Sequence, residues 1–354
     1  MDLDQLGGWP GVLSRLFRGN DLQPDEAEAA LTDVLLGNAA AAQIAAFVAA
    51  LRTKGETAEE MTGLVRAMLA HAAPVVVADE LRASMVDTCG TGGDRSHSIN
   101  VSTIASFVVA GAGVPVCKHG NRAASSAAGS ADVLEALGVT IDPGPEVVAR
   151  CIERVGIGFC FAPRFHAALR HAAPTRRELG VPTVFNFLGP LANPARPRRQ
   201  VVGVSDHRMA DKVIAVLAAN GAERAMVVFG HDGLDELSTS APSTVLSHSD
   251  GEVTTFEVDP RALGIAPASI DDIKGGDAAT NAAMALGVLA GESGPHRDIV
   301  VLNAAAGLIV GGACASMEEG LVLAGQVVDD GRARVALDGL VRESGAGVGE
   351  RSRG

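Results

Sequence analysis

The sequence predicts an α/β protein with a small helical N-terminal domain and a larger α/β domain with a mainly parallel central sheet. Three observations support this prediction. Residues 1–73 show only the spacing of apolar residues that is typical of amphipathic helices. From Ser84 onward, short apolar runs alternate with helix-like segments, as in parallel sheets whose strands are joined by crossover helices. The composition, with 47% hydrophobic but only 3% aromatic residues, suits helices packed on buried strands.

The N-terminal segment contains clear helix start signals. Pro24-Asp25-Glu26 begins a helix with a proline and two acids in its first turn, where acids favour the positive end of the helix dipole. Apolar residues from Ile44 to Leu51 recur at helical spacing, and Thr57 with Glu60 forms a capping box for the next helix. The apolar faces of these helices need a partner, which is either the rest of the chain or a second subunit.

The larger domain is predicted as an alternation of strands and helices with one interruption. The predicted strands are residues 84–86, 114–117, 139–141, 200–204, 225–229 and 298–303. The predicted helices are residues 101–112, 130–137, 209–219 and 277–290, with a further helix–strand unit over 146–161. Within the interruption at 164–195, residues 165–173 are predicted as a helix, a basic segment begins at Pro174, and 186–191 is predicted as a loop.

These patterns set the expected domain boundaries. We expect a helical domain at 1–73, joined by about 164–190, because the insert can pack back on the N-terminal helices. The α/β domain is expected at 74–342. A tail at 343–354, rich in Gly, Arg and Ser, is expected to be flexible.

The charge balance and the cysteines exclude several classes of function. With 29 basic and 42 acidic residues the net charge is −13, so neither a nucleic acid nor an anionic membrane is an expected partner. The five cysteines form no CxxC pair, so no disulfide framework or zinc site is predicted, and Cys89 and Cys117 are expected to face the core. The acidic start Met1-Asp2-Leu3-Asp4 resembles no targeting signal, and the apolar runs are too short to span a membrane. We expect a cytoplasmic enzyme.

Basic residues are nevertheless concentrated in the middle of the chain. They are Lys118, Arg122, Arg164, Arg170, Arg176 and Arg177, in a region that also holds His119, His166 and His171. A basic pocket inside an acidic protein indicates a small anionic ligand, although a solvated basic face gives the same pattern.

The segment Asp87-Thr88-Cys89-Gly90-Thr91-Gly92-Gly93-Asp94 is a glycine-rich loop between an apolar run and a helix-like run. It is no Walker loop, because no Gly-Lys-Ser or Gly-Lys-Thr follows, and no GxGxxG fingerprint, because Arg95 stands at the third glycine position. Glycines let backbone N–H groups approach an anion, and the helix that starts near Val101 adds free donors. Side-chain donors at that start are Ser98, Asn100, Ser102 and Thr103. A tight turn with an ordinary helix cap is the alternative.

A second polar segment, Lys118-His119-Gly120-Asn121-Arg122, follows the next predicted strand. Ligands of open α/β sheets bind beyond the carboxyl ends of the strands, so this segment, the first loop and the loop at Asp235 are expected at one edge. Lys and Arg supply charge for phosphates, and Gly120 permits a close approach. Ser125, Ser126 and Ser130 lead into another helix start, a second candidate seat for a phosphate. A solvated turn is the alternative for the segment taken alone.

Asp235 and Glu236 are adjacent carboxylates directly after a predicted strand. Mg²⁺ prefers oxygen ligands and is commonly held by one or two carboxylates together with substrate phosphates. The pair therefore indicates a Mg²⁺ site, with an ordinary surface pair as the alternative. The sequence shows no HExxH motif and no order of residues typical of a Ser-His-Asp triad, and no residue is assigned as general acid or base.

Several motifs in a fixed order resemble those of the anthranilate phosphoribosyltransferase family. They are DTCGTGGD at 87–94 with its S-x-N-x-S-T continuation, KHGNRAASS at 118–126, GSADVLEALG at 129–138, RRELGVPTVFNFLGPLANP at 176–194, DGLDE at 232–236 and GGDAATNA at 275–282. The resemblance runs from about residue 10 to about residue 335. Several independent motifs in one order are far more specific than any one of them.

The resemblance implies a fold, a reaction and an assembly. The fold is that of nucleoside phosphorylases and related phosphoribosyltransferases, with a helical domain and an α/β domain. The reaction joins anthranilate to 5-phosphoribosyl 1-pyrophosphate (PRPP), gives N-(5-phosphoribosyl)anthranilate and pyrophosphate, and belongs to tryptophan biosynthesis. Two Mg²⁺ ions per subunit and a homodimer formed through the helical domains are expected.

The resemblance also assigns site residues, position by position. Those matched to pyrophosphate binding are Gly90, Gly93, Asp94, Ser98, Asn100, Val101, Ser102 and Thr103. Those matched to the flexible loop over PRPP, with one further contact, are Lys118, His119, Gly120, Asn121, Arg122, Ala123, Ala124, Ser125, Ser126 and Ser130. Gly90, Asn121 and Arg176 match contacts to anthranilate. Ser102, Asp235 and Glu236 match the metal ligands.

This sequence departs from the common pattern of the family at four positions. Arg95 stands where glycine is frequent, Ala127 and Ala128 replace more polar residues, and Leu169 lies where larger side chains occur near the acceptor. These changes leave the sugar-phosphate assignment intact and bear on substrate affinity and on the restriction to anthranilate.

Three alternative functions stay open from the sequence. A pyrimidine nucleoside phosphorylase shares the fold class, but it uses phosphate and a nucleoside, whereas the paired Asp235 and Glu236 favour a pyrophosphate substrate. A non-enzymatic relative that binds nucleic acid is expected to have a basic surface, unlike this chain. A transferase that acts on a different aromatic acid has the same loops and is separated only by assay.

Overall fold

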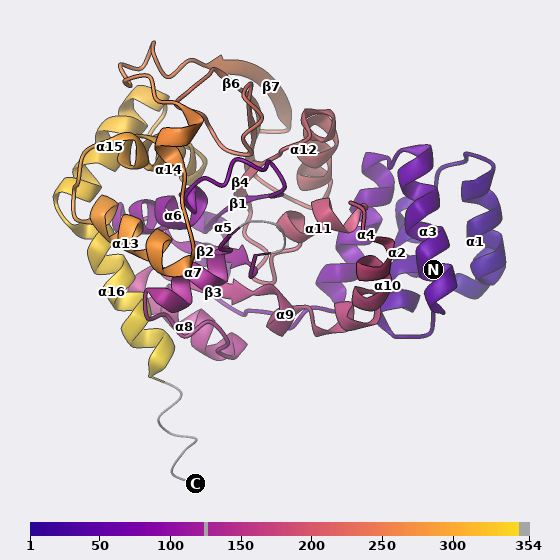
Figure 1. Cartoon of the computed structure of the whole chain (residues 1–354). Coiled ribbons are helices and arrows are strands. Elements are labelled where there is room, and N and C mark those ends of the chain that lie inside the picture. The colour runs from indigo at the N-terminus through magenta and orange to yellow at the C-terminus, as the bar shows by residue number, and fades with distance from the viewer. Residues whose placement is uncertain (124–126, 347–354) are drawn as a thin grey trace, which may run out of the picture.

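The computed structural model describes residues 1–123 and 127–346, and it has two lobes (Figure 1). The smaller lobe consists of helices from the N-terminal part and from the middle of the chain. These are η1 (Leu3–Leu6), α1 (Gly8–Phe17), α2 (Pro24–Leu35), α3 (Ala41–Lys54), α4 (Ala58–Ala70), η2 (Ala167–His171) and α10 (Ala173–Leu179). The larger lobe holds the sheet. The fold class predicted from the sequence is confirmed.

Seven strands form one sheet in the order β3-β2-β1-β4-β5-β6-β7. They are β1 (Val86–Gly90), β2 (Val116–Gly120), β3 (Ile157–Phe161), β4 (Arg199–Gly203), β5 (Arg224–Gly230), β6 (Ser243–Ser249) and β7 (Glu252–Val258). The first five in the sheet order are parallel, and β6 and β7 are antiparallel. Because β1 pairs Val86 with Val116 and Gly90 with Gly203, the three neighbouring strands β2, β1 and β4 all end in glycine at the same edge.

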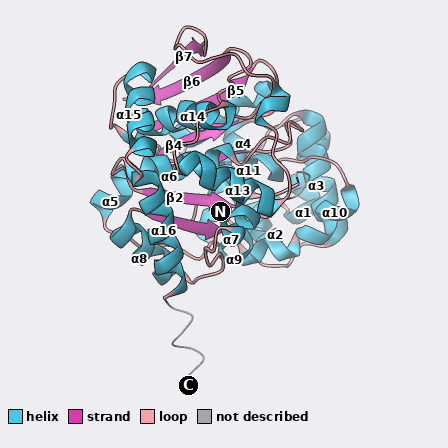
Figure 2. Ribbon diagram, turned by 60° about the vertical axis from the view of Figure 1, so that its left-hand side comes forward, coloured by secondary structure: helices cyan, strands magenta, loops and turns pink. Residues whose placement is uncertain are grey.

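Helices pack on both faces of the sheet (Figure 2). α6 and α14 cover β1 and β4 on one face, α12 lies against β5 and β6 on the other, and α8 packs on β3. The remaining elements are α5 (Asp79–Ser84), α6 (Val101–Gly111), α7 (Ser130–Ala136), α8 (Pro145–Val155), α9 (Ala162–Phe165), α11 (Phe185–Leu191), η3 (His207–Met209), α12 (Ala210–Ala219), η4 (Ile270–Ile273), α13 (Ala278–Leu289), α14 (Pro295–Gly311), α15 (Met317–Asp329) and α16 (Arg332–Gly345). This arrangement leaves the carboxyl edge of the parallel strands open toward the smaller lobe.

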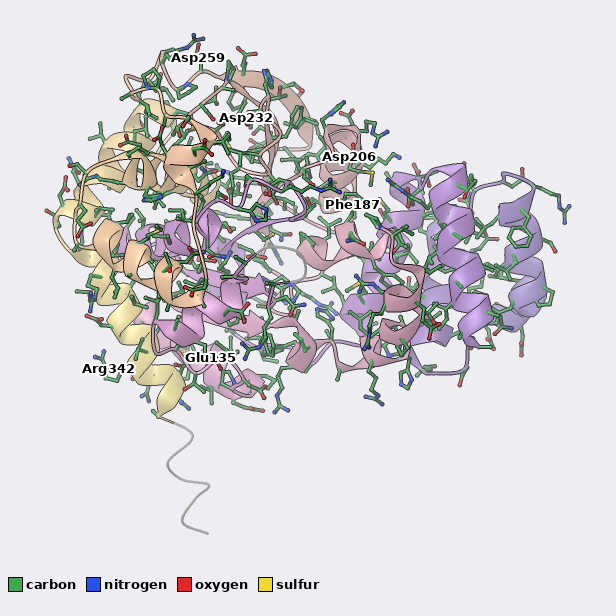
Figure 3. The ribbon with its side chains drawn as sticks, viewed as in Figure 1. Glu135, Phe187, Asp206, Asp232, Asp259 and Arg342 are labelled. Atoms are coloured by element: carbon green, nitrogen blue, oxygen red, sulfur yellow. The ribbon has the colours of Figure 1, made fainter. Side chains whose placement is uncertain are left out.

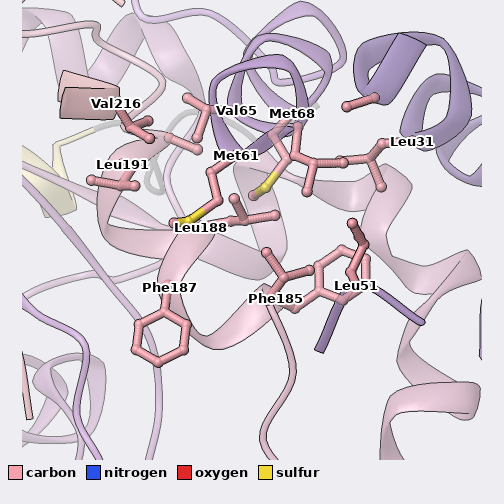
Figure 4. Close-up of a cluster of buried hydrophobic side chains, with 14 of the residues drawn as sticks. Leu31, Leu51, Met61, Val65, Met68, Phe185, Phe187, Leu188, Leu191 and Val216 are labelled. Carbon is pink, nitrogen blue, oxygen red and sulfur yellow. The ribbon is translucent and has the colours of Figure 1, made fainter. Parts of the chain in front are cut away.

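The two lobes share one hydrophobic core, and α11 connects them (Figure 4). Leu188 and Leu191 of α11 belong to the same cluster as Met61 and Val65 of α4 and Val216 of α12. Met61 and Leu188 are fully buried, and truncation of a side chain of this kind costs about 2–5 kcal/mol. The insert between β3 and β4 therefore packs on the N-terminal helices, while the exact domain boundaries stay a prediction.

The predicted capping box of α4 is present. The Glu60 backbone N–H donates to Thr57 Oγ1 at 3.1 Å, and the Thr57 N–H donates back to Glu60 Oε2 at 2.9 Å. Glu60 also accepts from the Leu22 N–H at 3.0 Å and from Lys54 Nζ at 3.0 Å, and it is fully buried. One carboxylate thus caps a helix and ties it to the segment before α2.

Two predicted strands are wrong. Residues 298–303 lie inside α14, whose side chains from Ile299 to Leu302 are almost all buried between other helices. A helix that is buried all round shows a continuous apolar run, and periodicity alone does not separate such a run from a buried strand. Residues 139–141 form no strand either; Val139 and Ile141 are buried from a loop after α7 and fill the core beside α6.

The predicted loop at 186–191 is wrong, because α11 occupies Phe185–Leu191. The Gly189-Pro190 pair suggested a loop, but a proline in the last turn of a short helix removes only one backbone hydrogen bond. Phe187 and Leu188 of this helix are buried, so tertiary packing outweighs the local signal.

Two predicted strands end later than expected. β2 continues through Lys118, His119 and Gly120, which were predicted as a loop, and β1 ends at Gly90 rather than at residue 86. Charged and polar residues suggested strand ends, yet these side chains find buried partners within the fold. The carboxyl ends of the strands therefore carry the site residues themselves.

The C-terminal region and one hairpin also differ from the prediction. α16 continues to Gly345, with Ser344 buried and Glu343 paired to Arg150 at 3.5 Å, so the expected flexible tail does not begin at residue 343. Residues 347–354 lie outside the described residues. The β6–β7 hairpin was not predicted, because β7 is exposed along most of its length and lacks an apolar face. No helix within the described ranges is long and apolar enough to cross a lipid bilayer.

Candidate active site

A cavity of about 540 Å³ opens at the carboxyl edge of the sheet, where the two lobes meet. Its walls include the ends of β1 and β2, the loops that follow β1, β4 and β5, and residues of α3 and α11. Phe187 and Asp206, labelled in Figure 3, both line it. The prediction that three strand-end segments share one edge is confirmed, since Gly90, Lys118 and Asp235 all line this cavity.

The glycines of the first loop have separate physical reasons. Gly92 and Gly93 adopt φ angles of 68° and 83°, in the left-handed region that favours glycine. Gly90 has a negative φ, but a Cβ built on it collides with the Asp235 carboxylate, and a Cβ on Gly203 collides with the Asp235 backbone. The strand-end glycines therefore let the Asp235 loop approach β1 and β4 closely.

The two carboxylates after β5 have few hydrogen-bond partners; Asp235 is buried and Glu236 is half-buried. The Gly92 N–H donates to Asp235 Oδ2 at 2.6 Å, and the Ser102 N–H donates to Glu236 Oε1 at 3.1 Å. Burial and then the neighbouring Asp94 raise the pKa of Asp235 to about 7, and burial and then Asp235 raise the pKa of Glu236 to about 8. No lysine or arginine of residues 1–123 and 127–346 forms an ion pair with either carboxylate. The two carboxylates therefore lack an ion-pair partner within the described residues.

Lys118 is buried at the end of β2 and bridges the first loop to the start of α6. Its Nζ donates to the Thr88 carbonyl at 2.6 Å and to Ser102 Oγ at 3.1 Å. Burial lowers the pKa of Lys118, and the negative charge of Asp87 opposes this shift. The ammonium therefore lies behind Ser102, where its charge acts on the cavity from within the fold.

His119 and Arg122 line the cavity, and both make contacts within the fold. Burial and then the nearby His166 lower the pKa of His119 to about 3, so its ring is neutral, with Nδ1 3.1 Å from the Gly189 carbonyl. Arg122 is partly exposed and pairs with Asp132 and Glu135, each at 2.8 Å. Neither side chain offers an unpaired positive charge to the cavity in this structure. The predicted site residues Ala124, Ser125 and Ser126 lie outside the described residues.

The remaining residues of the second segment hold its ends together. The Asn121 N–H donates to Ser130 Oγ at 3.2 Å, and Ser130 Oγ donates to the Asn121 carbonyl at 3.2 Å. A Cβ on Gly120 collides with Ser130, so glycine is needed where β2 meets the start of α7. Ala123 donates its N–H to Asp132 at 2.9 Å. The segment is therefore closed on itself at the base of the cavity.

The start of α6 is fixed from two sides. Asn100 donates its side-chain amide to the Ala128 carbonyl at 3.2 Å and accepts from Asn281 Nδ2 at 2.9 Å. Ser98, Val101, Ser102 and Thr103 also line the cavity. The free backbone N–H groups of a helix start, together with hydroxyl groups, suit an anion. Asn281 lies in the GGDAATNA motif, and the structure gives it the role of orienting Asn100.

Comparison with known proteins agrees with this geometry. Two models match the chain: the helical bundle domain of a glycosyl transferase family over residues 10–72, and its α/β domain over residues 82–334. An anthranilate phosphoribosyltransferase of Rhodococcus jostii (strain RHA1) is 54% identical over 335 residues, which cover 93% of this chain and 91% of the relative. The chain belongs to the anthranilate phosphoribosyltransferase family. A second member, from Salinispora arenicola (strain CNS-205), is 51% identical, and the matched residues cover 93% of this chain and 95% of that relative.

Solved structures of anthranilate phosphoribosyltransferases have the same fold. The enzyme from Thermus thermophilus superposes with a TM-score of 0.89 at 40% identity, covering 94% of this chain and 99% of its own. The Saccharomyces cerevisiae enzyme, in complex with PRPP and Mg, superposes with a TM-score of 0.87 at 26% identity, covering 96% of this chain and 98% of its own. The same yeast enzyme with 4-fluoroanthranilate gives a TM-score of 0.86 at 25% identity, with the same two coverages.

Arg176, which matches an anthranilate contact of the family, does not line the cavity in this structure. It lies on α10 with its guanidinium 4.9 Å from the ring centre of Phe185, in a cation–π contact. Burial lowers its pKa, and no residue within the described ranges forms an ion pair with it. Because Phe185 begins α11, and Asn186 and Phe187 line the cavity, Arg176 lies next to the wall rather than in it.

Several cavity residues of this member of the anthranilate phosphoribosyltransferase family were not predicted from the sequence. They are Arg52, Thr91, Arg95, Pro182, Asn186, Phe187, Ser205 and Asp206. Ser205 and Asp206 directly follow β4, so the strand-end rule, applied to every parallel strand, predicts them. Arg52 comes from α3 in the smaller lobe, and no local signal brings it to the cavity.

The oxygen donors of the cavity fit a hard divalent cation. Asp235 is buried, Glu236 is half-buried, both are poorly paired, and Ser102 lies at the start of α6 with its N–H bonded to Glu236. In the part of the chain that the structure describes, no group of three or more His, Cys, Asp or Glu side chains has metal-site geometry. This set of two carboxylates and a hydroxyl suits Mg²⁺, which commonly completes its octahedral shell with water and substrate phosphates.

Proposed function

We propose that this protein transfers the phosphoribosyl group of PRPP to the amino group of anthranilate, which gives N-(5-phosphoribosyl)anthranilate and pyrophosphate in tryptophan biosynthesis. One observation carries the proposal: the glycine loop after β1, the Lys118 strand end and the Asp235-Glu236 pair meet in one cavity. The names of the relatives, which are anthranilate phosphoribosyltransferases at 51–54% identity, support the same reaction.

Acidic residues gather at one end of the cavity, although the proposed substrate is a polyanion. Asp94, Asp235 and Glu236 repel a diphosphate unless cations lie between them, so the carboxylates and the substrate are expected to bind the metal together. We propose that Asp235, Glu236 and Ser102 hold Mg²⁺, with two ions per subunit. Bound Mg²⁺ neutralises the charge that develops on the leaving pyrophosphate.

The backbone and hydroxyl donors at the ends of β1 and β2 and at the start of α6 are proposed to bind the phosphates. They combine glycines that expose backbone N–H groups, the helix start, and the buried charge of Lys118. The proposed set is Gly90, Gly93, Asp94, Ser98, Asn100, Val101, Ser102, Thr103, Lys118, His119, Gly120, Asn121, Arg122, Ala123 and Ser130. Arg122 needs to leave Asp132 and Glu135 to contact a phosphate, which makes its contribution conditional on movement of the loop.

The acceptor is proposed to lie between the cavity and the smaller lobe. Gly90 and Asn121 line the cavity at the strand ends, and Arg176 is a nearby cation that forms no ion pair with a described residue. A small movement of α10 or of Phe185 brings that guanidinium toward a carboxylate in the cavity. Bidentate recognition of a carboxylate is the typical use of such an arginine.

The bond changes need no protein nucleophile. The amine nitrogen forms a bond to C1 of the ribose, the bond from C1 to the pyrophosphate oxygen breaks, and one N–H proton leaves the nitrogen. An aromatic amine is neutral and nucleophilic at pH 7, so the contribution of the protein is mainly positioning and charge stabilisation. No side chain is assigned to accept the proton.

The direct test is the loss of anthranilate fluorescence on incubation with PRPP and Mg²⁺. We expect loss only when both are present, together with release of pyrophosphate. Thymidine with inorganic phosphate, in the same buffer, tests the nucleoside phosphorylase alternative, and a panel of substituted 2-aminobenzoates tests the restriction to anthranilate. Absence of any PRPP-dependent loss overturns the proposal.

We further propose a homodimer formed through the smaller lobe. Three large apolar side chains of that lobe are exposed: Met1 and Phe17 each at 67% and Leu36 at 57%. Large apolar groups gathered on one lobe favour a protein–protein contact. Light scattering of the eluting protein is expected to give twice the mass of 36.0 kDa, and Phe17→Glu is expected to shift it to the monomer if this face is the interface.

A further inference from the structure

A second cavity, of about 650 Å³, lies at the opposite edge of the sheet. Its walls come from α4, α5 and α12 and from the segments that lead into β4 and β5. It is therefore separated from the cavity at the carboxyl edge by the length of the strands. We propose that this second cavity binds a small ligand with closely spaced anionic oxygens, such as a phosphate or a dicarboxylate, and that the bound anion affects the first cavity through Asp87.

Positive charge is concentrated in the wall of this cavity. Arg66, Arg82, Arg196 and Arg198 line it, and Glu28 is the one acidic residue among the described residues that do so. Arg82 and Arg198 each use a single Nη atom in an ion pair outside the lining, with Asp79 and Glu223. Each guanidinium carries five N–H donors, so most donors remain for a ligand. Such a concentration is unexpected by chance in a chain of net charge −13.

Two buried donors in the wall have no acceptor in the protein. Arg82 Nε and Asn220 Nδ2 are both inaccessible to solvent, and neither forms a hydrogen bond. They come from different elements, α5 and the residue after α12. Unpaired buried N–H groups destabilise a fold unless a bound group accepts from them. Both donors lie on residues that line the cavity and need an acceptor oxygen, which is the chemistry that an anion supplies.

The backbone of one wall residue is also held in an uncommon conformation. Arg196 has a φ of 50°, in the left-handed region, and its Nη2 donates to the Leu69 carbonyl at 3.0 Å. Residues in this region cost free energy and persist where the surrounding structure imposes them. The conformation directs the arginine across the cavity toward α4 and keeps its charge at the wall.

Buried hydrogen bonds connect this wall to the first cavity. Asn193 and Gln200 line the second cavity, and their side-chain amides donate to Asp87 Oδ2 at 2.9 and 3.5 Å. The other oxygen, Asp87 Oδ1, accepts from the His119 N–H at 3.2 Å on β2. His119 and its neighbour Lys118 line the first cavity. An anion that changes the hydrogen bonds of Asn193 or Gln200 therefore acts on Asp87 and on the end of β2.

Binding is tested by calorimetric titration of the Mg²⁺-free protein with inorganic phosphate and, separately, with malonate. We expect the double variant Arg82→Gln/Arg198→Gln to bind at least tenfold more weakly than the wild type. The matched control is Arg334→Gln, because Arg334 on α16 is exposed like Arg198 and pairs with Asp338 at 2.9 Å. Its affinity is expected to stay within twofold of the wild type. Wild-type affinity of the double variant for both anions, or no binding to the wild type, overturns the proposal.

Two further measurements keep the test decisive. If the double variant does not fold, Asn220→Asp places a carboxylate at the unpaired donor, and it is expected to weaken binding at least tenfold. Under the proposed function the first cavity also binds phosphate, so Lys118→Met is titrated in parallel and is expected to retain the binding that Arg82→Gln/Arg198→Gln loses. Loss of all binding in Lys118→Met places the anion in the first cavity and overturns the proposal.

The connection through Asp87 is tested by steady-state kinetics, and this part rests on the proposed transferase activity. The change in the KM for PRPP on adding the anion is measured in the wild type and in Arg82→Gln/Arg198→Gln. The change in the wild type is expected to be at least threefold larger, because only competition at the first cavity remains in the variant. Equal changes in both proteins overturn the coupling. The titrations need no turnover, so failure of the proposed function leaves the binding result readable.

Discussion

Two groups of carboxylates in this molecule differ in how completely the protein pairs them. Glu60, in the smaller lobe, accepts hydrogen bonds from the Leu22 and Thr57 N–H groups and from Lys54 Nζ, all within 3.0 Å. Asp235 and Glu236, in the cavity of the larger lobe, accept backbone hydrogen bonds from Gly92 and Ser102 respectively, and neither forms an ion pair with a described residue. Glu60 and Asp235 are buried, and Glu236 is half-buried.

The difference separates a structural carboxylate from a functional one. The protein supplies Glu60 with a cation and with donors on both oxygens, so its ionised form is stabilised within the fold. It gives Asp235 and Glu236 neither an ion-pair partner nor donors on both oxygens. Burial and then Asp94 raise the pKa of Asp235 to about 7, and burial and then Asp235 raise the pKa of Glu236 to about 8. Oxygens that the fold leaves unpaired are the ones available to a cation or a substrate.

The largest expected effect is on turnover. In Asp235→Asn with Glu236→Gln, we expect kcat/KM to fall about 10³-fold or more, because metal binding supplies several kcal/mol of charge stabilisation. The free energy of unfolding is expected to stay the same or to rise, because two poorly paired charges are removed. The anthranilate fluorescence assay and urea unfolding measure the two effects.

The exposed hairpin offers a matched control for this double variant. Asp250→Asn with Glu252→Gln also removes two carboxylates, but both side chains lie at the exposed β6–β7 turn. It is expected to keep wild-type turnover. Normal turnover of Asp235→Asn with Glu236→Gln in Mg²⁺ contradicts the metal assignment. A large fall in the free energy of unfolding of this variant means that the two carboxylates stabilise the fold, as Glu60 does.

The opposite result is expected for the structural carboxylate. Glu60→Gln leaves Lys54 with one partner fewer and turns an amide N–H₂ toward backbone donors, so the free energy of unfolding is expected to fall by about 3 kcal/mol. Turnover at a temperature where the variant is folded is expected to match the wild type. Urea unfolding measures the loss, and Glu59→Gln, an exposed neighbour on α4, is the control that is expected to change neither quantity.

Asp87 is intermediate between the two groups and gives a prediction about pH. It has partners on both oxygens, yet burial raises its pKa to about 6, while the charge of Lys118 opposes the shift. A raised carboxyl pKa means that the stability contributed by Asp87 is fully present below its unfolded pKa, about 3.9, and is lost as pH rises through about 6. The shift of roughly two units corresponds to about 3 kcal/mol.

The measurement is the free energy of unfolding of the wild type minus that of Asp87→Asn, from pH 4 to pH 7. This difference is expected to fall by about 3 kcal/mol across the range, since the variant has no proton to lose at this position. His119, whose pKa is lowered to about 3, is present in both proteins, so its own titration largely cancels. A flat difference means that Asp87 is ionised throughout this range.

The sequence predicted the parts of this fold that depend on local signals. Thr57 and Glu60 predicted the start of α4 because a capping box acts within four residues. Residues 298–303 and 186–191 were predicted wrongly because their structure depends on burial among other helices. An apolar run surrounded by helices becomes part of α14, and a Gly-Pro pair remains helical where Leu188 is packed in the core.

The candidate site divides in the same way. Gly90, Lys118 and Asp235 were predicted to converge because parallel strands bring their carboxyl ends to one edge. No sequence pattern indicated that Arg52 of α3 reaches the cavity or that Arg122 is paired with Asp132, since these contacts depend on how separate elements pack. The roles of the site residues in binding stay predictions until the variants are measured.

The smallest expected effect concerns the backbone of the two lobes. In the smaller lobe, left-handed positions such as those that follow α2 and α3 are occupied by Gly37 and Gly55, whereas the first loop places Arg95 at a φ of 61°. A side chain in the left-handed region costs about 1–2 kcal/mol, which replacement by glycine removes. The greater freedom of glycine in the unfolded chain offsets part of this stabilisation. Arg95→Gly is therefore expected to raise the free energy of unfolding by about 0.5–1 kcal/mol.

Urea unfolding of Arg95→Gly beside Arg95→Ala separates backbone strain from loss of the side chain. Alanine keeps the Cβ and with it the strain, so only the glycine variant is expected to be more stable than the wild type. If the free energy of unfolding rises equally in both variants, the arginine charge rather than backbone strain destabilises the wild type. If neither gains, the loop tolerates a φ of 61° without strain, and the functional loop is then as relaxed at this position as the helix ends of the smaller lobe.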